Sequence, residues 1–98
     1  MGADLKTIEK SLKEIKPLIE GKYHVKEIGI FGSYLKGKQK KSSDLDLLVE
    51  FSEPVSLFDF IRLEDFLTQE LGVKVDLVMR DALKVRIKEK VIKEVLNV

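Results

Sequence analysis

The chain has 98 residues, enough for one small domain. Its formal net charge is only +1, although 36% of its residues are charged, so no strong overall field attracts nucleic acid or an anionic membrane. The absence of cysteine excludes a disulfide framework and thiolate metal ligands, and no apolar stretch approaches the roughly 20 residues that span a bilayer. We therefore expect a single domain over residues 1–98 of a soluble, cytoplasmic protein.

The N-terminal segment has the pattern of an amphipathic helix. Apolar residues recur at steps of three and four over residues 5–19, and Asp4 is a suitable N-cap. Pro17 lies within this stripe and is expected to end or kink the helix, because proline lacks a backbone N–H. Gly21 is expected to end whatever helix follows.

Two strands are predicted around a polar connection. The β-branched segment 25–31 predicts a strand that closes at Gly32. The almost wholly apolar segment 45–51 predicts a second strand that is buried on both faces. Between them, residues 33–37 suit one helical turn and residues 39–43 suit a polar loop.

The second half of the chain predicts helix, strand and helix. Ser56 is the expected N-cap of a helix that stops before Gly72. The side of this helix expected to be buried consists of Leu57, Phe60, Ile61, Phe66, Leu67 and Leu71. Residues 73–79 predict a third strand, and Asp81 is the expected cap of a last helix, apolar on one side as far as Val95, that covers the sheet. This order predicts an α/β (α+β) fold, a small mixed β-sheet with helices packed against it.

Asp44 and Asp46 stand at the start of the second strand. Side chains alternate along a strand, so both point to the same face while Leu45 and Leu47 point to the other. Asp76, in the third strand, joins them if the second and third strands are neighbours. Two bare carboxylates about 4 Å apart repel by roughly 4 kcal/mol at an effective dielectric constant of 20, so such a cluster requires protons, cationic partners or metal ions. Oxygen ligands without nearby His or Cys suit Mg²⁺ or Mn²⁺.

The Gly32-Ser33 pair complements these carboxylates. Glycine allows a phosphate to approach the backbone closely, and Ser33 offers a hydroxyl and an N–H at the start of a turn. Four lysines follow, at positions 36, 38, 40 and 41, and they either neutralise phosphate charge or form a solvated loop. The residues together predict a site for a metal–triphosphate complex.

These motifs resemble those of a known superfamily. Gly32-Ser33, ten intervening residues and then Asp44-Leu45-Asp46 resemble the signature of DNA polymerase β-like nucleotidyltransferases. The stretches "FGSYLKG", "SDLDLLVEF" and "LGVKVDLV" are similar to those of minimal nucleotidyltransferases, the antitoxin halves of HEPN/MNT toxin–antitoxin modules. The resemblance extends over about residues 25–98, and Asp76 matches the third carboxylate of the superfamily.

The resemblance implies a palm-like nucleotidyltransferase fold and two-metal-ion catalysis. The implied metal ligands and catalytic residues are Asp44, Asp46 and Asp76, and the implied triphosphate-binding residues are Gly32, Ser33 and Lys36. Asp76 would help to deprotonate the acceptor. Two Mg²⁺ ions, or Mn²⁺, and ATP would serve to transfer AMP to a tyrosine hydroxyl of a partner HEPN ribonuclease toxin. Many relatives have Arg where this chain has Lys36, which retains the charge but not the bidentate fork.

Plainer interpretations and other functions stay open at this point. Asp44 and Asp46 could cap a turn, Asp76 could form a structural salt bridge, and Arg80 could contact nucleotide or be solvated. His24 suits a surface or packing role, and Tyr34 a packing role.

The protein could neutralise its partner by docking without catalysis, or modify a small molecule or RNA. Nucleic-acid binding is disfavoured by the small net charge and the lack of interleaved aromatics. Apolar residues left uncovered on so thin a domain would favour association, including a homo-oligomer.

Overall fold

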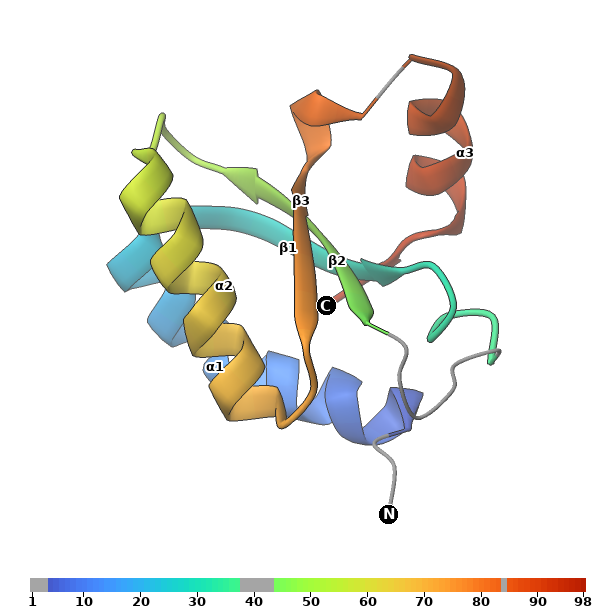
Figure 1. Ribbon diagram of the computed structural model, residues 1–98, viewed down its shortest axis with the longest axis horizontal. Helices are drawn as coiled ribbons and strands as arrows, with labels where there is room; N and C mark the ends of the chain where they lie inside the picture. Colours follow the sequence, from blue (N-terminus) through green and yellow to red (C-terminus); the bar gives the residue numbers. More distant parts are fainter. Residues whose placement is uncertain (1–3, 38–43, 84) are drawn as a thin grey trace.

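The structure is a computed structural model that describes residues 4–37, 44–83 and 85–98. In chain order its elements are α1 (Leu5–Tyr23), β1 (Val25–Phe31), β2 (Leu45–Phe51), α2 (Leu57–Leu71), β3 (Val75–Met79), the 3₁₀ turn η1 (Arg80–Ala82), α3 (Val85–Glu94) and β4 (Leu96–Asn97). The strands form one sheet in the order β3-β2-β1-β4 (Figure 1). β1 is antiparallel to β2 and β4, whereas β2 and β3 are parallel. The predicted fold class, a mixed sheet with packed helices, is confirmed.

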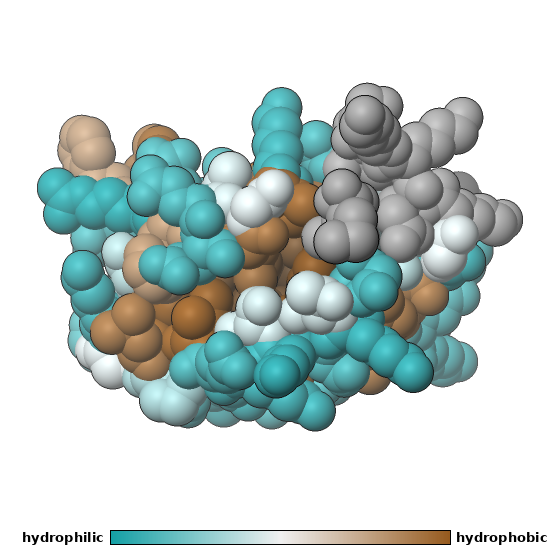
Figure 2. All heavy atoms as spheres, turned by 90° about the horizontal axis from the view of Figure 1, so that it is seen from below, coloured by the Kyte–Doolittle hydropathy of each residue, from teal (hydrophilic) through white to brown (hydrophobic). Residues whose placement is uncertain are grey.

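Helices α1 and α2 pack against one face of this sheet and enclose the core. Alternate residues of the three longer strands point towards these helices. The fully buried core side chains are Ile8, Leu12, Ile19, Ile28, Ile30, Leu45, Leu47, Val49, Leu63 and Leu67. α3 lies apart from the α1–α2 pair, on the other side of the sheet (Figure 1). Seen from the side on which α1 lies, apolar atoms are visible between hydrophilic margins (Figure 2), and Leu18 of α1 remains 50% exposed.

α1 is longer than the sequence predicts. It begins as expected, with the Asp4 carboxylate accepting a hydrogen bond from the Thr7 N–H at 2.8 Å. The helix continues through both Pro17 and Gly21 to Tyr23, so the prediction that either residue ends it is wrong. The kink expected as the alternative at Pro17 stays a prediction. Residues beyond the proline remain useful to the core: Ile19 is fully buried. Burying such a side chain contributes about 1.5–3 kcal/mol, which is comparable with the roughly 3 kcal/mol that an internal proline costs.

α2 uses a slightly different face from the one predicted. Leu67 is buried as expected, and so is Leu63, which the pattern did not single out. Leu57 and Ile61 are exposed, at 74% and 45%. The covered stripe follows Phe60, Leu63 and Leu67 at steps of three and four, which places the other two side chains on its flank.

The open edge of β3 is protected by α2. The Glu64 carboxylate accepts a hydrogen bond from the Leu77 N–H at 2.9 Å, and the Thr68 hydroxyl accepts one from the Val75 N–H at 3.1 Å. Glu64 and Thr68 are four residues apart and therefore lie on one side of the helix. They satisfy backbone donors that an edge strand would otherwise expose to pairing with another chain.

The C-terminal segment differs most from the prediction. Asp81 lies in η1 instead of capping a helix, α3 ends at Glu94, and the chain then forms β4, which was not predicted. β4 pairs with β1 opposite Gly29 and Ile30. A side chain at Gly29 would place its Cβ 2.6 Å from Val95 Cγ2, so this crossing requires glycine. α3 contributes to a second layer, on the face opposite α1 and α2.

None of the helices in the described ranges has the length and apolar character required to cross a bilayer.

Candidate functional site

Asp46 lies on the face of β2 that points away from α1 and α2, and Asp44 immediately precedes this strand. Leu45 and Leu47 are both 0% exposed in the core, so the alternating aspartates project from the opposite face. Both aspartates are half-buried. For Asp46 the predicted orientation is confirmed.

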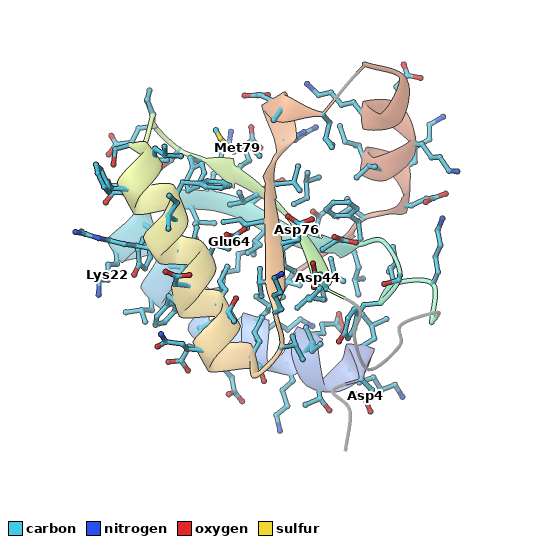
Figure 3. The ribbon with its side chains drawn as sticks, viewed as in Figure 1. Asp4, Lys22, Asp44, Glu64, Asp76 and Met79 are labelled. Carbon is cyan, nitrogen blue, oxygen red and sulfur yellow. The ribbon has the colours of Figure 1, made fainter. Side chains whose placement is uncertain are left out.

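β3 brings Asp76 beside them. β2 and β3 are parallel neighbours, and Asp46 and Asp76 are direct partners in the register. Neighbouring strands lie about 4.8 Å apart, so these two residues are lateral neighbours on one face. In Figure 3 Asp76 is seen on β3 and Asp44 immediately before the neighbouring strand β2. The strand order, which the sequence left open, is therefore the one that places Asp76 beside Asp46.

The carboxylates influence one another electrostatically. Partial burial raises the pKa of Asp46 above its ordinary value of 3.8, and the charges of Asp76 and Asp44 raise this pKa further. A hydrogen bond between the Asp46 and Asp76 side chains acts in the same direction. The ionised form of Asp46 is thus less favourable than that of a solvent-exposed aspartate.

Gly32 packs directly against this group. Its φ of 78° lies in the left-handed region that favours glycine, and a Cβ at this position would overlap with Asp46 Oδ2. The preceding residue, Phe31, is the register partner of Asp46 on the antiparallel side. Glycine is therefore required here both for the turn out of β1 and for close approach to the carboxylate.

The segment after Gly32 forms tight turns. The Lys36 N–H donates to the Gly32 carbonyl at 3.3 Å, and the Gly37 N–H donates to the Tyr34 carbonyl at the same distance. Ser33 is half-buried at the start of these turns. It directly follows Gly32, which packs against Asp46. Tyr34 is 5% exposed and belongs to the core, so its predicted packing role is confirmed.

Lys36 lies within reach of α3. Its Nζ is 3.8 Å from Glu94 Oε2, and both side chains are partly exposed. Its contact with a triphosphate stays a prediction. The other three lysines of the proposed clamp, at positions 38, 40 and 41, lie outside the described residues, as does the predicted polar loop.

The donor chemistry of the three aspartates suits a hard divalent cation, because all the donors are carboxylate oxygens. Within the described ranges, no three acidic or histidine side chains are already gathered in an arrangement that could hold a metal ion. Asp46 and Asp76 share one face of the adjacent strands β2 and β3, so these two carboxylates are placed to ligate one ion together.

Sequence reasoning missed Phe31 as a neighbour of the site. It is half-buried and lies outside the core cluster, on the same face as Asp46. The alternation along β1 contained this signal, since Ile28 and Ile30 are core residues and Phe31 therefore points to the opposite face.

Comparison with known proteins identifies the family. The sequence matches the nucleotidyltransferase domain family over residues 5–97. This chain belongs to that family. As a nucleotidyltransferase, it is similar to the protein adenylyltransferase MntA of Thermococcus cleftensis, with 46% identity over 94 residues that cover 96% of this chain and 95% of the relative.

Solved structures share the nucleotidyltransferase fold. One, described provisionally as a minimal nucleotidyltransferase, has a TM-score of 0.83 and 35% identity, and the match covers 96% of this chain and 95% of that chain. A toxin–antitoxin structure with AMP-PNP has a TM-score of 0.71 and 26% identity, with 89% and 70% covered. The fold is also shared by a complex of tri-AMPylated Shewanella oneidensis HEPN toxin with MNT antitoxin. That match has 20% identity and a TM-score of 0.66, and it covers 92% of this chain and 70% of that chain.

Proposed function

We propose that this nucleotidyltransferase transfers AMP from ATP to a tyrosine hydroxyl of a HEPN-type ribonuclease toxin in the cytoplasm, acting as its antitoxin through a single domain of residues 1–98. The observation that supports this most is the register of β2 and β3, which aligns Asp46 with Asp76 beside Gly32. A relative named protein adenylyltransferase supports a protein acceptor, and a fold neighbour bound to an AMPylated HEPN toxin supports the kind of partner.

Asp44, Asp46 and Asp76 would hold two divalent ions, Mg²⁺ or Mn²⁺. When bound, these ions supply charge neutralisation for the triphosphate and acidify the attacking hydroxyl. The raised pKa of Asp46 supports this assignment, because a bound cation would offset the burial and the neighbouring negative charges that raise this pKa.

The strand order suggests where donor and acceptor lie. Gly32 and Ser33 end β1 on one side of Asp46, and Asp76 lies on the other side, on the edge strand β3. Gly32 and Ser33 would bind the triphosphate through backbone N–H groups and the Ser33 hydroxyl. Asp76 is exposed and would face the incoming acceptor.

The reaction follows from this arrangement. The acceptor hydroxyl oxygen forms a bond to the α-phosphorus, and the bond from that phosphorus to the α–β bridging oxygen breaks. Pyrophosphate leaves with the electron pair, and the hydroxyl proton passes to the Asp76 carboxylate. The products are an AMP ester of the acceptor and pyrophosphate.

The test is mass spectrometry of the helical partner after incubation with this protein, ATP and Mg²⁺. We expect the partner mass to increase by one or more AMP units, and we expect no increase with the Asp44→Asn/Asp46→Asn variant. Asp65→Asn, an exposed substitution on α2, is the matched control and should transfer AMP as the wild type does.

Other outcomes would contradict the proposal in distinct ways. A stable complex without a mass increase would indicate neutralisation by docking alone. Modification of RNA or of a small molecule, with no modification of the partner, would indicate a different acceptor.

A further inference from the structure

A cavity of about 140 Å³ lies between the sheet and α3, on the same face as the aspartates. Its apolar wall is formed by Leu48 of β2, Ile92 of α3 and Val95. Leu48 is 6% exposed but lies outside the core cluster, consistent with its pointing away from α1 and α2. An engineered cavity of about 150 Å³ accommodates benzene, so the volume of this one is sufficient for one aromatic ring.

The cavity continues directly from the aspartates along β2. Asp46, Leu48 and Glu50 alternate on one face, with steps of about 6.6 Å from one to the next. Leu48 and Glu50 line the cavity, and Asp46 belongs to the carboxylate group. A nucleotide whose α-phosphate lies at Asp46 would therefore extend over Leu48, and the length of its nucleoside is enough to reach the cavity.

Charged and polar side chains also line the cavity: Glu27 of β1, Glu50 of β2, Arg80 of η1 and Asn97 of β4. Arg80 Nη1 is 3.3 Å from Glu50 Oε1, which positions a guanidinium plane and a carboxylate beside the apolar wall. Asn97 of β4 supplies an amide, which carries both donors and an acceptor. Asparagine pairs bidentately with the N6 and N7 edge of adenine in nucleic-acid recognition.

The position of the cavity suits the nucleotide that donates AMP better than the hydroxyl-bearing acceptor. Its sheet floor comes from β1 and β2, the strands that also present Gly32 and Asp46. Asp76 and Val78, the residues of β3 on this face, do not line it. The cavity thus lies on the triphosphate side of the carboxylates.

From these observations we infer that the cavity binds the base of the donor nucleotide, with Leu48, Ile92 and Val95 against the ring and Asn97 at its polar edge. This inference rests on the proposed nucleotidyl transfer and adds a base-binding subsite to it. A purine would extend partly from the cavity, with one ring inside. The element that was not predicted from sequence, β4, then has a function in addition to pairing with β1.

The experiment compares two ligands that share phosphates but not a base. Binding of a non-hydrolysable ATP analogue and of inorganic tripolyphosphate, each with Mg²⁺, is measured by calorimetry for the wild type and for Ile92→Trp, which fills the cavity. We expect the variant to bind the ATP analogue about tenfold more weakly and tripolyphosphate within about twofold of the wild type. Ile61→Trp on the exposed flank of α2 is the matched control and should bind both ligands normally.

A second variant tests the polar edge without altering the apolar wall. Asn97 is exposed, so Asn97→Ala should leave the fold intact. We expect it to reduce the preference for ATP over GTP by about five- to tenfold. Photolabelling of the wild-type protein with 8-azido-ATP should modify the segment 91–98.

Each result either supports or overturns the inference. Unchanged binding of the ATP analogue by Ile92→Trp, an equal loss of tripolyphosphate binding, or photolabelling confined to other segments would overturn it. In those cases AMP transfer by the wild type would still stand. If the wild type binds neither ligand and transfers no AMP, the proposed function and this inference both fail.

Discussion

The substitution Asp46→Asn should stabilise the protein in the absence of divalent cations. It removes one of three neighbouring negative charges and retains the shape of the side chain. Adjacent strands are about 4.8 Å apart, and two unit charges at that separation repel by roughly 1–3 kcal/mol for effective dielectric constants between 80 and 20. Asp46 is half-buried and Asp76 exposed, so solvent screening favours the low end, about 1 kcal/mol. For a domain of this size that corresponds to a rise in Tm of about 4–8 °C.

The stability that Asp46→Asn gains over the wild type should increase as the pH rises. The pKa of Asp46 is raised on folding, so the folded protein binds this proton more tightly than the unfolded chain does. Wild-type stability therefore falls as the pH rises through the ordinary value of 3.8, and the loss is complete above the raised pKa of the folded state. Asp46→Asn lacks this loss, so its advantage should be small below that value and full at neutral pH.

Thermal unfolding followed by circular dichroism at acidic and neutral pH measures both effects. Asp65→Asn removes one negative charge from an exposed position of α2 and should leave Tm nearly unchanged. Added Mg²⁺ should raise the Tm of the wild type more than that of Asp46→Asn, because a ligand stabilises the state that binds it.

A lower Tm for Asp46→Asn at neutral pH without Mg²⁺ would refute the electrostatic reasoning. It would mean that the Asp46 carboxylate is satisfied by the surrounding groups and is a structural residue. An equal gain at both pH values would also contradict the argument, since it would not depend on ionisation.

Substitutions at three further positions test the backbone of the sheet. Gly32→Ala should reduce nucleotidyl transfer at least tenfold and destabilise the fold by about 1–3 kcal/mol, because the new Cβ combines a positive φ with overlap on Asp46. Transfer assays and thermal unfolding measure the two effects, and wild-type activity of the variant would contradict the prediction. Glu64→Ala should lower the free energy of unfolding by about 1–3 kcal/mol, because it leaves the Leu77 N–H without its acceptor. Glu64→Gln should recover most of that loss, since its amide oxygen also accepts. Equal stability of the two variants in denaturant unfolding would disprove the role of Glu64 as the acceptor. Gly29→Ala should displace β4 and make the C-terminal segment sensitive to limited proteolysis, an outcome that unchanged protection would exclude.

Local sequence determined the three longer strands, the helix α2 and the chemistry of the candidate site. The alternation around Asp44 and Asp46 placed both carboxylates on one face, because the two-residue period of a strand does not depend on its neighbours. The end of β1 was equally local, since Gly32 adopts a backbone conformation that other residues rarely take. The mixed-sheet fold followed from the order of these elements.

Tertiary structure decided what depends on distant partners. The strand order joined Asp76 to Asp46, although 30 positions separate them in the sequence. Packing carried α1 through Pro17, because the burial of Ile19 offsets the cost of a proline inside the helix. β4 has two residues, too few for a periodic pattern, and exists because Gly29 leaves room for it across the sheet. Sequence periodicity reports which face of an element is apolar, whereas long-range pairing and steric fit determine which faces meet.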